Sequence, residues 1–141
     1  MASFNFNSFV FDVVTGSIDL NTDNFKMMLV SVLPGETAKD TWTKRSDVTN
    51  EVTGTGYTAG GTAVTLTVAA VDTANNDVEV TCSAPSWPSS TISGVAGVIY
   101  KSRGGAASAD ELVGSIDFGG TVTSTNGTFT VTPSGSIKFQ N

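Results

Sequence analysis

The sequence predicts an all-β fold, a jelly-roll-like antiparallel β-sandwich with one short N-terminal helix. Two patterns lead to this prediction. Apolar residues alternate with Thr and Ser over several short stretches, as in strands with one face inward. Turn-forming residues separate these stretches, giving about seven or eight strands with turns roughly every 8–12 residues. The 141 residues are expected to form a single domain, 1–141, that buries its own core.

The one predicted helix lies at residues 7–16. Four apolar residues recur there at the spacing of one helix face: Phe9, Val10, Val13 and Val14. Asn7 or Ser8 is placed to cap the start, and Gly16 to end the helix. Because β-branched valines lose rotamer freedom in a helix, a strand is the alternative.

Residues 25–32 form a continuous apolar run, which we predict to be a strand buried on both faces and stopped by Pro34 and Gly35. A polar segment rich in Thr, Gly and charge follows at 36–61. It is long for a loop inside a compact domain. We therefore expect short irregular pieces there, forming a polar arm or loop that contacts a partner.

From residue 63 onward the alternation is regular. Residues 63–68 and 78–82 predict a hairpin with one face inward, closed by a turn at 73–76. The prolines on either side of Trp87, at 85 and 88, are expected to break the pairing.

Three further strands are predicted beyond the prolines. They cover 91–101, 112–118 and a short edge strand around Ile137 and Phe139, and the alternation at 128–132 adds another. Gly119 and Gly120 are expected to end the second of these strands. Asn126 followed by Gly127 is a strong signal for a tight hairpin turn.

The composition argues against catalysis. The chain has no histidine, one cysteine and 14% charged residues, whereas most hydrolytic, metal-dependent and nucleophilic chemistries use His, Cys or grouped carboxylates. Cys82 shares a face with apolar residues and is expected in the core. An enzyme with two carboxylates is the alternative, but Asp110 and Glu111 are adjacent on a strand and would point to opposite faces. We expect no enzyme activity and no cofactor.

Two short motifs resemble ligand loops only in part. The D-x-N-x-D pattern at 19–23 lacks the glycine and the final glutamate of a calcium loop, so a polar turn is expected. The glycine-rich stretch at 54–61 lacks the spacing and the lysine of a phosphate loop, so a flexible loop is expected. We therefore predict no metal site.

Charge and hydropathy restrict the partners. Seven basic residues are scattered among thirteen acidic ones, for a net charge of −6, whereas nucleic-acid binding requires a clustered basic surface. The N-terminus lacks the pattern of a signal peptide, and no run approaches the ~20 apolar residues of a membrane span. We expect no direct nucleic-acid partner, no membrane partner and synthesis in a cytoplasm.

Five residues are candidates for a protein interface: Trp42, Lys44, Arg45, Tyr57 and Trp87. Tryptophan is enriched at interface hot spots, and Trp87 stands on stiff backbone between prolines. The alternative is that each tryptophan covers an end of the sandwich. Lys44 and Arg45 belong to a local charge cluster, which is either a solvated surface or part of an intersubunit ion pair.

Several stretches carry a family resemblance: RSDVTNEV at 45–52, TGTGYTAGG at 53–61 and further stretches at 16–20, 25–30, 71–78, 96–100, 116–120 and 126–129. They resemble the capsid cement, or decoration, proteins of tailed bacteriophages, in particular podophages. The resemblance spans nearly the whole chain and rests on its overall pattern. It implies a jelly roll without enzyme activity. It also implies homodimers on the outer surface of an icosahedral shell, where they bridge neighbouring major capsid protein subunits and stabilise the shell.

The same resemblance implies a virion protein assembled in the cytoplasm of a bacterial host. The alternative function is a head-fibre or tail component that binds a host receptor or glycan. In that case an exposed Trp42, Tyr57 or Trp87 would stack on sugar rings.

Overall fold

The computed structural model describes residues 3–141. Within that range the chain forms eight strands and two short α-helices. In chain order these are β1 (Phe4–Asn5), α1 (Asn7–Val14), β2 (Phe25–Val30), α2 (Glu36–Thr41), β3 (Thr62–Val64), β4 (Leu66–Val68), β5 (Asp77–Cys82), β6 (Ser86–Lys101), β7 (Leu112–Thr130) and β8 (Ile137–Gln140). Two 3-10 turns, η1 (Arg45–Asp47) and η2 (Ala107–Ala109), lie in the connections.

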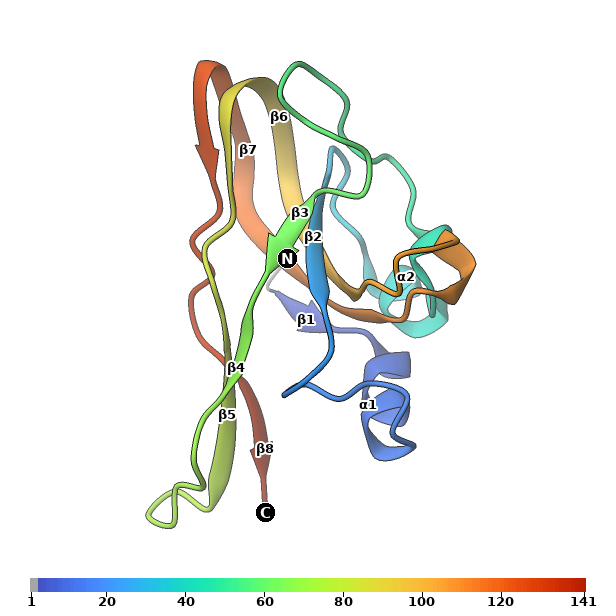
Figure 1. Ribbon diagram of the computed structural model, residues 1–141, viewed down its shortest axis with the longest axis vertical. Helices are drawn as coiled ribbons and strands as arrows, with labels where there is room; N and C mark the ends of the chain where they lie inside the picture. Colours follow the sequence, from blue (N-terminus) through green and yellow to red (C-terminus); the bar gives the residue numbers. More distant parts are fainter. Residues whose placement is uncertain (1–2) are drawn as a thin grey trace.

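The strands form two antiparallel sheets (Figure 1). The larger sheet has the order β1-β7-β6-β2-β3 and the smaller one the order β4-β5-β8. Figure 1 shows the smaller sheet extending beyond the larger one, with α1 facing it across the lower half of the molecule. The two antiparallel sheets and the short N-terminal helix confirm the predicted fold class.

The apolar run at 25–32 forms β2, a central strand of the larger sheet, and both of its faces are buried as predicted. Met27 and Leu29 belong to the core between the sheets, whereas Met28 and Val30 belong to a second cluster on the opposite face. The strand ends at Val30, two residues earlier than predicted.

The predicted strand at 63–68 is divided between the two sheets. Its first part, β3, pairs with β2, and its second part, β4, pairs with β5. Thr65, between them, is the point where the chain passes from one sheet to the other. The predicted hairpin is confirmed by the pairing of Leu66 with Cys82, and a turn at 73–76 closes it.

Three predicted strand breaks are wrong. Pro88 lies within β6, and the glycine pair at 119–120 and the Asn-Gly pair at 126–127 lie within β7, whereas Pro85 directly precedes β6; the two strands pair along most of their length. Trp87 itself pairs with Phe129. The signals mark irregularities instead, because Ser89, Gly119 and Asn126 have φ of 50°, 77° and 47° and the register shifts nearby. Bulges use the same left-handed backbone that tight turns require.

The bulges near Ser90 turn the β6–β7 ribbon over a corner, and Figure 1 shows both strands curving together at the top of the molecule. The buried Ser90 Oγ lies 2.9 Å from the Trp87 carbonyl oxygen and 3.0 Å from that of Gly127. It also lies 2.7 Å from Ser124 Oγ, which accepts a hydrogen bond from the Ile92 amide at 3.3 Å. The two hydroxyls thus supply hydrogen bonds where the strand ladder is interrupted.

The predicted N-terminal helix is confirmed as α1, with Gly16 in a left-handed conformation (φ 81°) just beyond its end. No side chain caps its first turn. Phe9 is buried and Val13 half-buried, but Val10 and Val14 are exposed. The prediction of one inward face is therefore correct for only two of the four apolar residues.

The polar segment at 36–61 holds the short irregular pieces expected of it, including η1, and also the single-turn helix α2, which was not predicted. Its later part lies along β2: Glu51 forms a bridge with Val30, and the Val52 amide donates to the Leu29 carbonyl oxygen at 2.9 Å. Val52 is buried in the core. The segment is thus packed on the sheet.

Candidate protein-interaction surface

The five predicted interface residues do not share one surface. Trp87 is 4% exposed and belongs to the core, where its ring lies 6.0 Å from those of Tyr57 and Phe129. The structure therefore supports the interpretation that Trp87 fills the sandwich. It leaves Trp87 no ring face to offer a partner or a sugar.

Tyr57 fixes the glycine-rich loop to β2. Its hydroxyl donates to Glu51 Oε1 at 2.8 Å and accepts from the Leu29 amide at 3.0 Å. Glu51 Oε1 also accepts from the Gly60 amide. Burial, with the nearby Glu51 carboxylate, raises the pKa of the Tyr57 hydroxyl well above its usual value. Its role is to hold the loop.

Lys44 and Arg45 form ion pairs inside the chain rather than on a free surface. Arg45 Nε donates to Asp110 Oδ2 at 2.8 Å, and Lys44 Nζ lies 3.3 Å from Glu111 Oε1. Arg103 binds both oxygens of Glu111, at 2.7 and 2.9 Å. We call Lys44, Arg45, Arg103, Asp110 and Glu111 the buried ion cluster.

The two carboxylates of the buried ion cluster are almost fully enclosed, with Asp110 1% and Glu111 4% exposed. Burial alone would raise the pKa of Glu111, but hydrogen bonds from Arg103 and the charge of Lys44 lower it to about 2. The cluster ties η1 to the loop that joins β6 and β7. The lowered pKa keeps Glu111 ionised at neutral pH, where it is the counter-charge of Lys44 and Arg103.

Trp42 is a predicted interface residue that is only partly buried and lines a surface pocket. One side of its indole stacks on Phe6, with ring centroids 6.2 Å apart and planes 24° apart. Its backbone is held by bonds from its own amide to the Ala38 carbonyl and from Ser8 Oγ to its carbonyl. Trp42 also lines a pocket of ≈ 380 Å³ beside α2.

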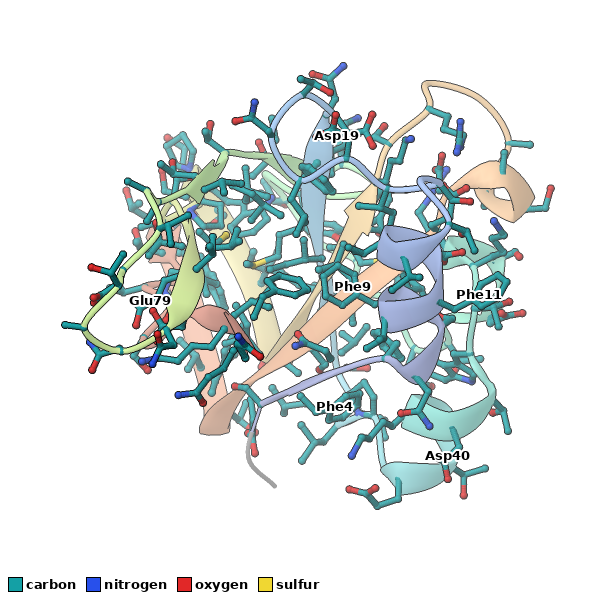
Figure 2. The ribbon with its side chains drawn as sticks, turned by 90° about the horizontal axis from the view of Figure 1, so that it is seen from below. Phe4, Phe9, Phe11, Asp19, Asp40 and Glu79 are labelled. Carbon is teal, nitrogen blue, oxygen red and sulfur yellow. The ribbon has the colours of Figure 1, made fainter. Side chains whose placement is uncertain are left out.

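The largest apolar exposure on one element is on α1. Val10, Phe11 and Val14 are 56%, 68% and 80% exposed, and their spacing places them side by side on the helix surface. Figure 2 shows Phe9 directed into the molecule and Phe11 away from it. We call these three residues the α1 stripe. A stripe of this kind on a helix marks a contact surface more often than a scattered apolar residue does.

The sequence pattern does not reveal the α1 stripe, because periodicity identifies apolar residues without showing which of them the core can cover. Nor does it reveal Asp110 and Glu111 as partners of Arg45 and Lys44. The adjacent acids gave a signal, but their partners lie far away in the sequence.

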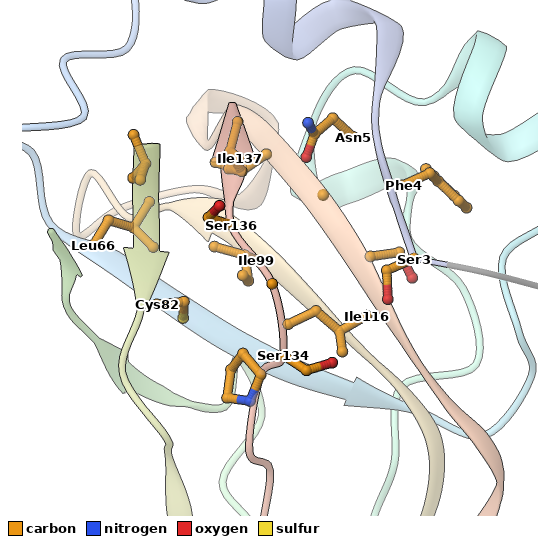
Figure 3. Close-up of a pocket in the computed structure, with 16 residues that line it drawn as sticks. Ser3, Phe4, Asn5, Leu66, Cys82, Ile99, Ile116, Ser134, Ser136 and Ile137 are labelled. Carbon is orange, nitrogen blue, oxygen red and sulfur yellow. The ribbon is translucent and has the colours of Figure 1, made fainter. Parts of the chain in front are cut away.

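A cavity of about 180 Å³ lies between the sheets, next to β1 (Figure 3). Leu66, Ile99, Ile116 and Ile137 form its apolar lining, and no charged side chain of the described residues lines it. Cys82 borders this cavity half-buried against the core. Burial raises the pKa of the Cys82 thiol to about 11, so the thiol is protonated at neutral pH.

The segment at 19–23 forms the expected polar turn. Asp19 Oδ1 accepts from the Asn21 amide at 2.9 Å, and Asp23 Oδ2 accepts from the Asp19 amide at 2.7 Å. Residues 3–141 contain no group of three or more acidic or cysteine side chains placed to hold a metal ion.

The described part of the chain has no helix with the length and apolar character needed to span a membrane. Comparisons of the chain with protein-family models, with curated proteins and with solved structures found no match.

Proposed function

We propose that this protein is a capsid cement protein that acts without catalysis. It binds the outer surface of an icosahedral phage capsid as a homodimer and bridges neighbouring major capsid protein subunits. The observation that carries the proposal is the α1 stripe, a large apolar surface on a small domain that has no cover within residues 3–141. The resemblance of the sequence to phage cement proteins supports the choice of partner.

The distribution of charge also supports a protein partner. Six of the seven basic residues form ion pairs inside the chain: Lys39, Lys44, Arg45, Lys101, Arg103 and Lys138. Nucleic acid binds through clustered, unpaired cations, so neither it nor an anionic membrane is a partner in this proposal.

The proposed mechanism is mechanical. A DNA-filled shell is under outward pressure, and a protein bound across the joints adds interface that must break before the shell opens. A specific interface buries about 1,200–2,000 Å², and repetition by symmetry adds avidity beyond any single contact. The corner of β6–β7 and the buried ion cluster make the domain a stiff bridge.

The test is the copy number of the protein in purified virions of the phage that encodes it, measured by quantitative mass spectrometry against the major capsid protein. A ratio near unity, within a small factor, supports a symmetric shell component. A handful of copies per particle supports a head-fibre or tail component instead, and absence from virions overturns the proposal.

A second measurement tests the surface. Phe11→Ser should abolish binding of the purified protein to shells that lack it, while the circular dichroism spectrum and thermal midpoint stay unchanged, because Phe11 is exposed. The control is Val122→Ser, which alters an exposed apolar residue on β7. Equal binding by both variants would remove α1 from the interface.

A further inference from the structure

The pocket beside Trp42 combines an aromatic ring with polar groups. Its volume is ≈ 380 Å³. Its apolar part comprises Leu33, Pro34 and Trp42, and its polar part comprises Glu36, Thr37, Thr49 and Asn50. Ligand sites typically consist of an apolar surface with a few convergent polar groups, and about 300–1,000 Å³ is their usual size.

The apolar part of the pocket is preorganised. Phe6 supports the Trp42 indole from one side, and Pro34 and Ala38 beside it are buried. Hydrogen bonds at both the amide and the carbonyl of Trp42 hold its backbone. A ligand ring therefore meets an aromatic surface that is already in place, which reduces the ordering cost of binding.

The polar part of the pocket is also fixed at its backbone. Asn50 has a φ of 62°, and its carbonyl accepts from both the amide of Ser31 at 2.9 Å and the hydroxyl of Ser31 at 3.2 Å. The Asn50 side chain donates to Thr49 Oγ1 at 3.1 Å, and both residues line the pocket. An amide offers both donors and acceptors to a ligand hydroxyl.

The combination of an indole ring with polar side chains limits the kinds of ligand that the pocket can bind. A purely apolar side chain from another protein would take the Asn50 amide and the Thr37 and Thr49 hydroxyls out of water. It would satisfy none of the hydrogen-bonding capacity that the Asn50–Thr49 bond leaves over, and such a loss is costly. An anionic ligand would meet Glu36, whose nearest cation, Lys39, is already 3.6 Å from it. A neutral sugar ring has an apolar face for the indole and hydroxyls for the amide and carboxylate.

We propose that this pocket binds a neutral saccharide of about one hexose ring, stacked on Trp42 and hydrogen-bonded by Asn50. The inference goes beyond the capsid role and does not depend on it. A capsid-bound copy would present a carbohydrate site, and so would a copy free in solution.

The experiment uses the isolated full chain and its two tryptophans. Because Trp87 is buried in the core, a change in emission on ligand addition reports Trp42. The methyl glycosides of glucose, galactose, mannose and N-acetylglucosamine are titrated separately, and binding is checked by NMR chemical shifts. We expect a saturable change with at least one of them, at millimolar affinity for a single ring.

Asn50→Gly is the decisive variant, because glycine keeps the left-handed backbone at this position and removes only the amide. It should weaken saccharide binding by about tenfold. Asn126→Gly is the matched control: it makes the same substitution at a similar φ, 47°, in β7, and should bind as the unaltered protein does.

Two results would overturn the inference. One is the absence of a saturable change with every glycoside in both fluorescence and NMR. The other is tighter binding of N-acetyl-leucine amide than of any glycoside, which would assign the pocket to an apolar side chain of a protein partner. Neither result bears on the copy number in virions, so the capsid proposal is judged separately.

Discussion

The buried ion cluster and the Glu79–Lys138 pair on the three-stranded sheet contain the same chemistry in different surroundings. Arg103 Nη2 lies 2.7 Å from Glu111 Oε1, and Lys138 Nζ lies 2.6 Å from Glu79 Oε1. The side chain of Glu111 is 5% exposed, whereas those of Lys138 and Glu79 are 54% and 39% exposed. Similar distances therefore correspond to unequal contributions to stability, because water screens the second pair and is excluded from the carboxylate of the first.

The difference in burial also changes the effect of removing one member of an ion pair. Removing a charge at the surface leaves its partner in water. Removing a carboxylate from the buried ion cluster leaves a cation close to the core without its counter-charge. We therefore expect carboxylate-to-amide substitutions to lower the free energy of unfolding much more in the buried ion cluster than in the surface pair.

The largest effect is expected for Asp110→Asn. Asp110 is 1% exposed and accepts from both Arg45 Nε and the Arg103 amide, so the variant leaves the Arg45 guanidinium without its carboxylate. The free energy of unfolding should fall by about 3 kcal/mol. Urea denaturation measures it, and a loss below about 1 kcal/mol would place this pair with surface ion pairs.

The second effect is a pH dependence that comes from Glu111. Its pKa is lowered from 4.5 to about 2 in the folded protein, so its stabilisation is complete above the unfolded pKa and is lost as the pH falls toward 2. The shift corresponds to about 3 kcal/mol. Measured between pH 5 and 2, the stability of Glu111→Gln should fall less steeply than that of the unaltered chain; parallel curves would argue against the assignment.

The smallest effect is expected for Glu79→Gln. The hydrogen bond and the charge of Lys138 lower the pKa of Glu79, but both side chains are largely exposed. The variant should unfold at the same urea concentration as the unaltered chain, within error. A destabilisation as large as that of Asp110→Asn would mean that burial does not separate the two regions.

Sequence patterns predicted those elements that local periodicity determines. The apolar run of β2, the alternation of β4 and β5, and the end of α1 just before Gly16 follow from spacing and backbone chemistry. The Asn-Gly pair at 126–127 led to the wrong prediction of a tight hairpin turn, because a β-bulge also uses left-handed backbone. Local signals identify the conformation of a residue without showing whether the strand continues.

The candidate surfaces depended on distant contacts and were less predictable. Arg45 meets Asp110 across 65 positions in sequence, and nothing near either residue indicates the other. Trp87 was judged from its flanking prolines, although its burial depends on Phe129 in β7. The exposure of Phe11 was not predicted, because the helix pattern assigned its apolar neighbours to the core.

The pairing of β1 with β7 has a consequence for synthesis on the ribosome. Phe4 lies opposite Ser115, and the amide of Phe6 donates to the carbonyl of Val113. β1 is therefore placed only after the residues up to Ser115 in β7 have been synthesised. Contacts of such long sequence separation slow folding to the millisecond-to-second range. The larger sheet is consequently complete only after β7 has been synthesised, and α1, which packs against β7, reaches its final position only then.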